Sequence, residues 1–350
     1  MVKVRVKTSK PYDVLIGSGI LKNAHEYIAE ITSSKRLAVI TDDIVNSLYA
    51  DTLIGVLEGA GFDICKYVFP NGEKSKNTVT YVNILNFLAE NHLTRIDTVI
   101  ALGGGVVGDM AGFAAATYLR GIRYVQIPTT LLSAVDSSVG GKCAVDLAAG
   151  KNLVGAFHQP SLVICDTDTL DTLKPEILSD GCGEVLKYGV LSTPELLVHL
   201  SEKGADFDRE EVISTCVKLK ADIVAEDEFD KGKRALLNLG HTTAHAIEKL
   251  SDFSVSHGSA VATGLAIIAR ICAAAGMCDE DTARDVEAAV KKLGHSLNTV
   301  YTAKQMCDII LSDKKRRGSV IDFVCIRSVG DCFVKAVSVE DTEAFVSMGI

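Results

Sequence analysis

The chain has 350 residues, which is long enough for two domains, and its 47% hydrophobic and 23% charged residues exclude a disordered chain. Its 36 lysines and arginines against 45 aspartates and glutamates give a net charge of −9. This charge argues against binding to nucleic acid or to a membrane surface, because phosphate-rich partners need a net basic face.

The N-terminal residues 1–10 alternate valine with lysine, which is a strand pattern without the apolar region of a signal peptide. The ten cysteines form no CxxC pair and are typical of buried thiols in a reducing compartment. The longest apolar stretch, 254–269, is shorter than the roughly 20 residues of a membrane-spanning helix, which predicts a core helix there. We therefore expect a cytoplasmic protein.

The first 170 residues alternate between two kinds of segment. A hairpin is expected at 2–8 and 12–16, and further β-rich runs lie at 36–41, 64–69, 97–102, 123–127 and 161–165. Helical spacing occurs between them, at 44–59 and 77–91. This alternation predicts an α/β domain with a parallel sheet covered by helices, and ligands at the carboxyl ends of its strands.

After residue 171, helical periodicity dominates. It is found at 176–190, 194–203, 210–225, 240–250, 257–275, 280–293 and 303–312. Two short β-rich segments follow at 319–326 and 331–337. We expect a second, mostly α-helical domain over 171–350.

One β-rich run ends in Gly103, Gly104 and Gly105, and a helical pattern follows. Glycines let a backbone approach a pyrophosphate, whose charge the first amides of a helix can meet. The spacing is not that of the GxGxxG fingerprint, so a strand–helix turn without a ligand is the alternative. Asp42, at the end of another run, fits either a ribose hydroxyl contact of NAD or a helix N-cap.

Charged residues also stand in less regular surroundings. Glu73 and Lys76 follow a predicted strand, as ligand contacts or as solvated charges. The segment 128–160 reads as a long loop, which in a compact domain is more often functional. Within it stand Asp136, two lysines and an asparagine (Lys142, Lys151 and Asn152), which indicate an anionic or hydroxyl-rich substrate.

Three of the eight histidines lie within 17 residues. His241 and His245 are four residues apart on one helical face, a spacing that suits a divalent metal, and His257 begins the next helical segment. A further ligand could be Glu248 on the same face, or Glu184, which has a lysine (Lys187) three residues after it.

Lys220 falls on the apolar stripe of the segment 210–225. Because lysines are seldom buried alone, its side chain either extends past the edge of the core or reaches an anion. Arg120, Arg234 and the run 313–318 add positive charge.

The chain resembles the 3-dehydroquinate synthase family over nearly its whole length. The ordered motifs are GGGVVGD, YLRGIRYVQIPTTLLSAVDSSVGGK, GKNLVGAFHQP, EVLKYG, LNLGHTTAHAIE, SHG and DKK. The resemblance implies a Rossmann-like NAD-binding domain at 1–170, a helical metal- and substrate-binding domain at 171–350, and a homodimer. It also implies conversion of a phosphorylated keto acid, DAHP, to 3-dehydroquinate and phosphate, with catalytic NAD and a divalent metal, zinc or alternatively cobalt.

The resemblance also assigns roles to residues. The metal ligands would be Glu184, His241 and His257, with His245 on the substrate side and Glu248 structural. The residues against the cofactor would be Asp42, Glu73, Lys76, Gly104, Gly105, Asp109, Thr129, Thr130, Lys142 and Lys151. Those at the substrate would be Arg120, Asp136, Lys142, Asn152, Lys187, Lys220, Arg234, Asn238, His245 and Lys314, or Lys315 in its place.

Three positions depart from the family's usual residues. Cys143 stands where threonine is common, Gly183 where alanine is usual, and Ile44 where some members have a polar NAD contact. The alternatives are a related sugar-phosphate cyclase, or a metal-dependent polyol or glycerol-phosphate dehydrogenase, which would release NADH. A non-catalytic relative would have lost a metal ligand.

Overall fold

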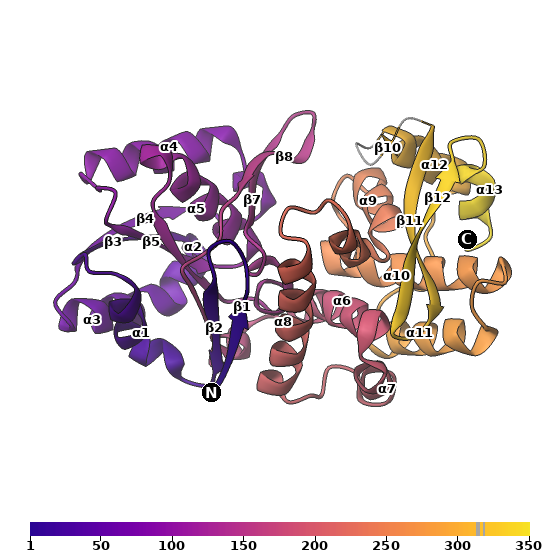
Figure 1. Ribbon diagram of the computed structural model, residues 1–350, viewed down its shortest axis with the longest axis horizontal. Coiled ribbons are helices and arrows are strands. Elements are labelled where there is room, and N and C mark those ends of the chain that lie inside the picture. The colour runs from indigo at the N-terminus through magenta and orange to yellow at the C-terminus, as the bar shows by residue number, and fades with distance from the viewer. Residues whose placement is uncertain (313–315, 318) are drawn as a thin grey trace. The chain divides into compact units, whose positions relative to one another are not determined.

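The computed structural model describes residues 1–312, 316–317 and 319–350, which form two compact units (Figure 1). Unit 1 comprises Met1–Leu173 and Arg209–Phe229, and unit 2 comprises Lys174–Asp208 and Asp230–Ile350. The boundary expected at residue 171 assigns the helix α8 (Arg209–Glu226) to the second domain. In the structure α8 packs against the first two strands of unit 1 instead.

The core of unit 1 is a seven-stranded sheet in the order β1-β2-β9-β6-β5-β3-β4. Its strands are β1 (Val2–Val6), β2 (Tyr12–Gly17), β3 (Arg36–Asp42), β4 (Asp63–Phe69), β5 (Thr98–Gly103), β6 (Arg123–Pro128) and β9 (Leu162–Asp166). All neighbours are parallel except the β1–β2 hairpin at the edge. The expected parallel α/β sheet and its N-terminal hairpin are therefore confirmed.

Helices cover both faces of this sheet because its central strands are apolar on both sides. In β3, Leu37 and Val39 belong to one core cluster, and Ala38 and Ile40 belong to the other. The first cluster includes residues of α1 (Ala24–Ile31) and α3 (Asp51–Gly59), and the second includes residues of α4 (Thr78–Glu90) and α5 (Gly105–Thr117). The turn α2 (Asp43–Val45) follows β3.

The segment 128–160 is not the long loop that its composition suggests. It contains a helical turn, η5 (Ser133–Ser137), and an antiparallel hairpin of β7 (Lys142–Leu147) and β8 (Gly150–Phe157). Strand β7 packs on α5 through the buried side chains of Cys143 and Val145. The small residues of the hairpin weaken its strand pattern, so the prediction of a loop from composition is wrong here.

Unit 2 is built around the helix α10 (His257–Ala274), which packs against helices on several sides. The other helices are α6 (Pro175–Ser192), α7 (Pro194–Lys203), η7 (Lys233–Asn238), α9 (His241–Leu250), α11 (Glu280–Lys292), α12 (Ala303–Ser312) and α13 (Thr342–Ser347). A small antiparallel sheet contains β10 (Arg316–Arg317), β11 (Val320–Ser328) and β12 (Asp331–Ser338). By length and composition alone α10 could span a bilayer, but 72% of it is buried in the protein, as expected of a core helix.

Candidate functional site

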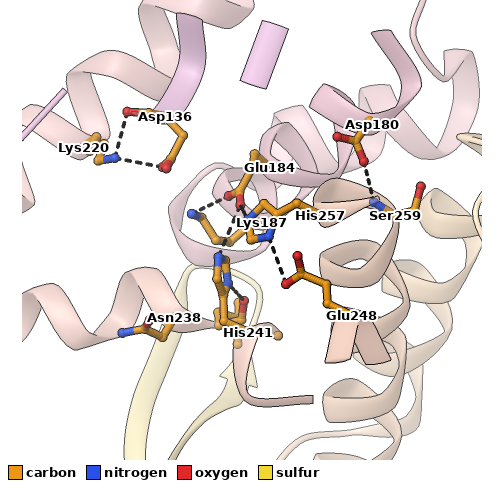
Figure 2. A network of polar contacts seen from close by, with 12 residues as sticks. Asp136, Asp180, Glu184, Lys187, Lys220, Asn238, His241, Glu248, His257 and Ser259 are labelled. Atoms are coloured by element: carbon orange, nitrogen blue, oxygen red, sulfur yellow. Dashed lines mark hydrogen bonds and ion pairs between the residues drawn. The ribbon is translucent and has the colours of Figure 1, made fainter. Parts of the chain in front are cut away.

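Three helices of unit 2 bring a carboxylate and two imidazoles together (Figure 2). Glu184 lies in the middle of α6, while His241 and His257 are the first residues of α9 and α10. The Oε1 atom of Glu184 lies 3.3 Å from Nε2 of His241 and 3.1 Å from Nε2 of His257. One ligand atom from each residue lies within 4.8 Å of the others, so these atoms could hold one metal ion.

The carboxylate of this group is buried next to a lysine. Glu184 and Lys187 are each 1% exposed, and Nζ of Lys187 lies 2.5 Å from Oε2 of Glu184. The two residues are three apart in α6, so one helical turn places them side by side. Burial alone would raise the pKa of Glu184, but Lys187 and the two imidazoles outweigh burial and hold this pKa well below its usual value.

The two histidines differ in their electrostatic surroundings. Burial lowers the pKa of His241 to about 4, although Glu184 acts in the opposite direction. Burial also disfavours a charge on His257, but hydrogen bonds to Glu184 and Glu248 outweigh it and raise the pKa to about 10. The ionised carboxylate and the imidazole nitrogens form a donor set that suits zinc, with three protein ligands as in catalytic sites.

Of the two histidines four residues apart on α9, only His241 belongs to this converging group. The ring of His245 lies beside the group, with its centroid 5.6 Å from that of His241 and 6.3 Å from that of His257, but it is not among the converging ligand atoms. Of the two candidate carboxylates, Glu184 contributes to the group. Glu248 lies behind His257, with Oε2 3.3 Å from Nδ1 of that ring.

A second polar network lies in unit 1. The Lys76 side chain is 6% exposed, and its Nζ lies 2.5 Å from Oδ2 of Asp109 and donates to Oδ1 of Asn152 at 2.7 Å. Asn152 has a left-handed backbone with φ of 54°, and its N–H donates to Asp146 at 2.7 Å. Burial would lower the pKa of Lys76, but Asp109 and Glu73 outweigh it and raise this pKa.

The glycine turn after β5 has close side-chain neighbours at the start of α5. A Cβ on Gly104 would lie 3.1 Å from Thr130, and one on Gly105 would lie 3.2 Å from Ser137. Thr129 is buried, and its hydroxyl has no hydrogen-bond partner among the residues that the structure describes. A buried hydroxyl of this kind beside a helix N-terminus fits a bound phosphate-containing cofactor.

Asp42 caps the helical turn that follows β3. Its Oδ1 accepts a hydrogen bond from the N–H of Val45 at 2.8 Å, and burial raises the pKa of its carboxyl group. The N-cap interpretation therefore holds, and a ribose contact would have to involve the remaining acceptor positions of this side chain. Nearby, Lys151 pairs with Glu73 at 3.4 Å.

Lys220 reaches a carboxylate within its own unit. It is buried on α8, and its Nζ lies 3.1 Å from Oδ1 of Asp136 and donates to the carbonyl of that residue at 2.8 Å. Its side chain therefore does not extend past the edge of the core.

The remaining candidates occupy varied surroundings. Arg120 is exposed and has a left-handed φ of 69°, while Lys142 is exposed on β7. Arg234 is buried in η7, where the side-chain amide of Asn238 donates to the carbonyl of Ala235. Lys314 and Lys315 lie outside the described residues.

The three departures have clear structural settings. Cys143 is buried against Gly112 of α5, and burial raises the pKa of its thiol to about 12, so it is a core residue. Gly183 lies where α6 meets α10, and a Cβ on it would overlap the carbonyl of Gly258. Ile44 is exposed on α2.

Comparison with known proteins identifies both halves of the chain. The family model described as 3-dehydroquinate synthase N-terminal matches residues 66–180, and the one described as 3-dehydroquinate synthase C-terminal matches residues 181–316. A curated 3-dehydroquinate synthase from Clostridium acetobutylicum is 41% identical over 341 residues, which cover 96% of each chain.

Solved structures share the fold over the full length. A 2-deoxy-scyllo-inosose synthase complexed with carbaglucose-6-phosphate, NAD+ and Co2+ superposes with a TM-score of 0.89 at 23% identity, covering 100% of both chains. The 2-epi-5-epi-valiolone synthase of Streptomyces hygroscopicus, with NAD+ and Zn2+ bound, gives a TM-score of 0.86 at 26% identity, covering 99% of this chain and 98% of its own.

Proposed function

This chain belongs to the 3-dehydroquinate synthase family, and we propose that the two polar networks described above carry the family's reaction in it. The protein is a carbon–oxygen lyase that converts DAHP to 3-dehydroquinate and phosphate, a step of the shikimate pathway to aromatic amino acids. The observation that carries the residue assignment is the convergence of both imidazole Nε2 atoms on one oxygen of Glu184.

Glu184, His241 and His257 would hold the divalent metal, zinc or cobalt. NAD would lie along unit 1, at Asp42, Glu73, Lys76, Gly104, Gly105, Asp109, Thr129, Thr130, Lys142 and Lys151. When bound, the metal supplies a Lewis acid to the substrate's oxygens, and NAD accepts and returns a hydride.

The protein's own side chains supply charge and orientation. Lys187 keeps Glu184 ionised, because its ammonium lies 2.5 Å from that carboxylate in a buried setting. Cationic side chains such as Arg120, Lys142 and Arg234 are suited to the phosphate and the carboxylate of the substrate. A flexible seven-carbon intermediate must be held through several steps, so the main task of these residues is positioning.

Other side chains hold the surrounding elements in place or would contact the polar groups of the substrate. The buried Lys220 and the partly exposed Asp136 form an ion pair that holds η5 against α8. The side chains of His245 on α9, Asn238 on η7 and Asn152 on β8 would contact the polar groups of the substrate. Lys314 is assigned to the substrate by family resemblance.

The test measures phosphate release from DAHP by the purified protein with zinc and catalytic amounts of NAD, while absorbance follows NADH. We expect one phosphate for each dehydroquinate formed, without net NADH. Phosphate release only from a sugar phosphate would identify a related cyclase, and accumulation of NADH with a polyol would identify a dehydrogenase.

We also propose, from the family resemblance and the composition, that the protein is a cytoplasmic homodimer. Sedimentation equilibrium of the purified chain tests the dimer, since 37.3 kDa is the mass of one copy. A single species at that mass over a wide concentration range would reject the dimer.

A further inference from the structure

Each metal-site histidine has two ring nitrogens, and the structure gives a partner to both. In His241, Nδ1 lies 3.1 Å from the carbonyl oxygen of Leu239, while Nε2 faces Glu184. In His257, Nδ1 lies 3.3 Å from Oε2 of Glu248, while Nε2 faces Glu184. A carbonyl and a carboxylate only accept hydrogen bonds, so Nδ1 of each ring is the donor to Leu239 or Glu248, and Nε2, on the side of Glu184, is the nitrogen that would bind the metal.

The two rings are held in different ways. The acceptor for His241 belongs to the backbone two residues before it, so the local chain geometry at the start of α9 fixes this ring. The acceptor for His257 is a side chain on another helix. The His257 side chain is also the more exposed of the two, at 34% against 11%. His257 therefore depends more on a partner that keeps its ring in place.

We propose that Glu248 is a positioning residue, whose carboxylate holds the His257 ring so that Nε2 points at the metal position. This inference rests on the proposed metal ligands and adds a residue to which the family resemblance gave only a structural role. Metal-bound histidines commonly donate their second N–H to a carboxylate, which fixes the tautomer and strengthens the ligand. Glu248 is 4% exposed, and a carboxylate is rarely buried to that extent unless it is paired with a hydrogen-bond donor or a positive charge.

The position of Glu248 follows from the helix that carries it. It is seven residues after His241 in α9, which is close to two full turns, so both side chains lie on the same face. That face meets the start of α10, where His257 is the first helical residue. One face of α9 thus supplies a proposed ligand and the acceptor that orients another.

Other contacts fix the backbone of His257 rather than its ring. Asp180 of α6 accepts a hydrogen bond from the N–H of Ser259 at 3.0 Å and so caps the first turn of α10 (Figure 2). The close approach of Gly183 and Gly258 sets the distance between the same two helices. These contacts place the Cα atom of His257, and Glu248 then sets the direction of the ring.

The test compares Glu248→Ala and Glu248→Gln with the wild type as full-length proteins. Zinc affinity is measured by competition with a chelator, and the visible spectrum of the cobalt form reports ligand geometry. We expect Glu248→Ala to weaken zinc binding by about 10–100-fold, and the nearly isosteric Glu248→Gln to weaken it less. Glu343→Ala, at an exposed site of unit 2, is the control and should bind zinc like the wild type.

A nitrogen NMR spectrum of the zinc-loaded wild type should show a protected Nδ1–H on His257, which Glu248→Ala would lose. Unchanged zinc affinity and cobalt spectrum in both Glu248 variants would overturn the inference. If Glu248→Ala does not fold, Glu248→Gln decides. His257→Ala tests the proposed ligand set separately, because wild-type zinc affinity in that variant would reject the ligand set itself.

Discussion

Both units bury a lysine 2.5 Å from a carboxylate, and the surroundings of the two pairs differ. In unit 1, Lys76 is shared between Asp109 and Asn152, and the side chain of Asp109 is 18% exposed. In unit 2, Glu184 is 1% exposed and faces two imidazoles on the side away from Lys187. A buried ion pair therefore indicates a metal site only when further donors converge on one of its members.

The largest expected effect concerns the converging donors. His257→Ala should lower turnover by more than about 100-fold, because it removes a ligand and not merely an outer partner of one. The folded structure should remain, since this side chain is 34% exposed. Phosphate release and circular dichroism measure the two effects, and unchanged turnover in metal-free buffer would contradict the ligand assignment.

The next effect contrasts the two lysines. Lys187→Met should destabilise the metal-free protein by about 3 kcal/mol, the lower end for breaking a buried pair, because His257 still faces Glu184. Lys76→Met should cost less, about 1–2 kcal/mol, because the Asp109 side chain is 18% exposed, against 1% for Glu184, so water can solvate its carboxylate. Urea unfolding measures both, and equal losses would show that exposure does not distinguish the pairs.

A smaller effect concerns helix packing. Gly183→Ala should cost about 1–3 kcal/mol, because its Cβ would overlap the carbonyl of Gly258. Gly55→Ala in α3 is the matched control, since a Cβ there has no atom within 4 Å among the described residues. The control should gain about 0.5–1 kcal/mol from helix propensity. Thermal unfolding compares the two, and a stable Gly183→Ala variant would mean that α6 and α10 separate easily.

The smallest expected effect is on the pH dependence of stability, to which one histidine in each unit contributes. Nε2 of His158 lies 2.8 Å from the carbonyl of Ile122, and Nε2 of His295 lies 3.0 Å from the carbonyl of Ser179. Burial lowers the pKa of both rings, so the unfolded chain binds more protons than the folded chain as the pH falls. The stability that the two neutral rings contribute is fully present above pH 6.5, the ordinary pKa of histidine. It is lost as the pH falls through their lowered pKa values in the folded protein.

Each of the variants His158→Gln and His295→Gln should therefore flatten the loss of stability between pH 7.5 and pH 5. Urea midpoints across this range measure the slope. A slope as steep as that of the wild type in both variants would assign the acid sensitivity to other groups.

Regular periodicity made most of the fold predictable. The β-rich run of β3 and the helical spacing of α10 are properties of single segments, and both predictions are confirmed. The β7–β8 hairpin was missed because Gly150 and Gly155 interrupt it and its packing on α5 replaces intrinsic strand preference. Helix α13, at 342–347, is too short to show a period.

The site was predictable to the extent that its contacts are local. Glu184 and Lys187 are one turn apart, so their pairing follows from helix geometry. The partner of Lys220 is 84 residues away in the chain, and no local spacing singles out Asp136. Glu248 had the right spacing to be a ligand, and only the fold shows that His257 lies between it and Glu184.

The three proposed ligands come from three different helices, so a bound ion would also hold these helices together. An ion bound to all of them would cross-link α6, α9 and α10 across chain separations of 57 and 16 residues. By mass action, an ion at 100 times its dissociation constant adds about 2.7 kcal/mol to stability. A chelator should therefore lower the resistance of unit 2 to proteolysis before it affects unit 1, so metal supply would govern the lifetime of this enzyme as well as its rate.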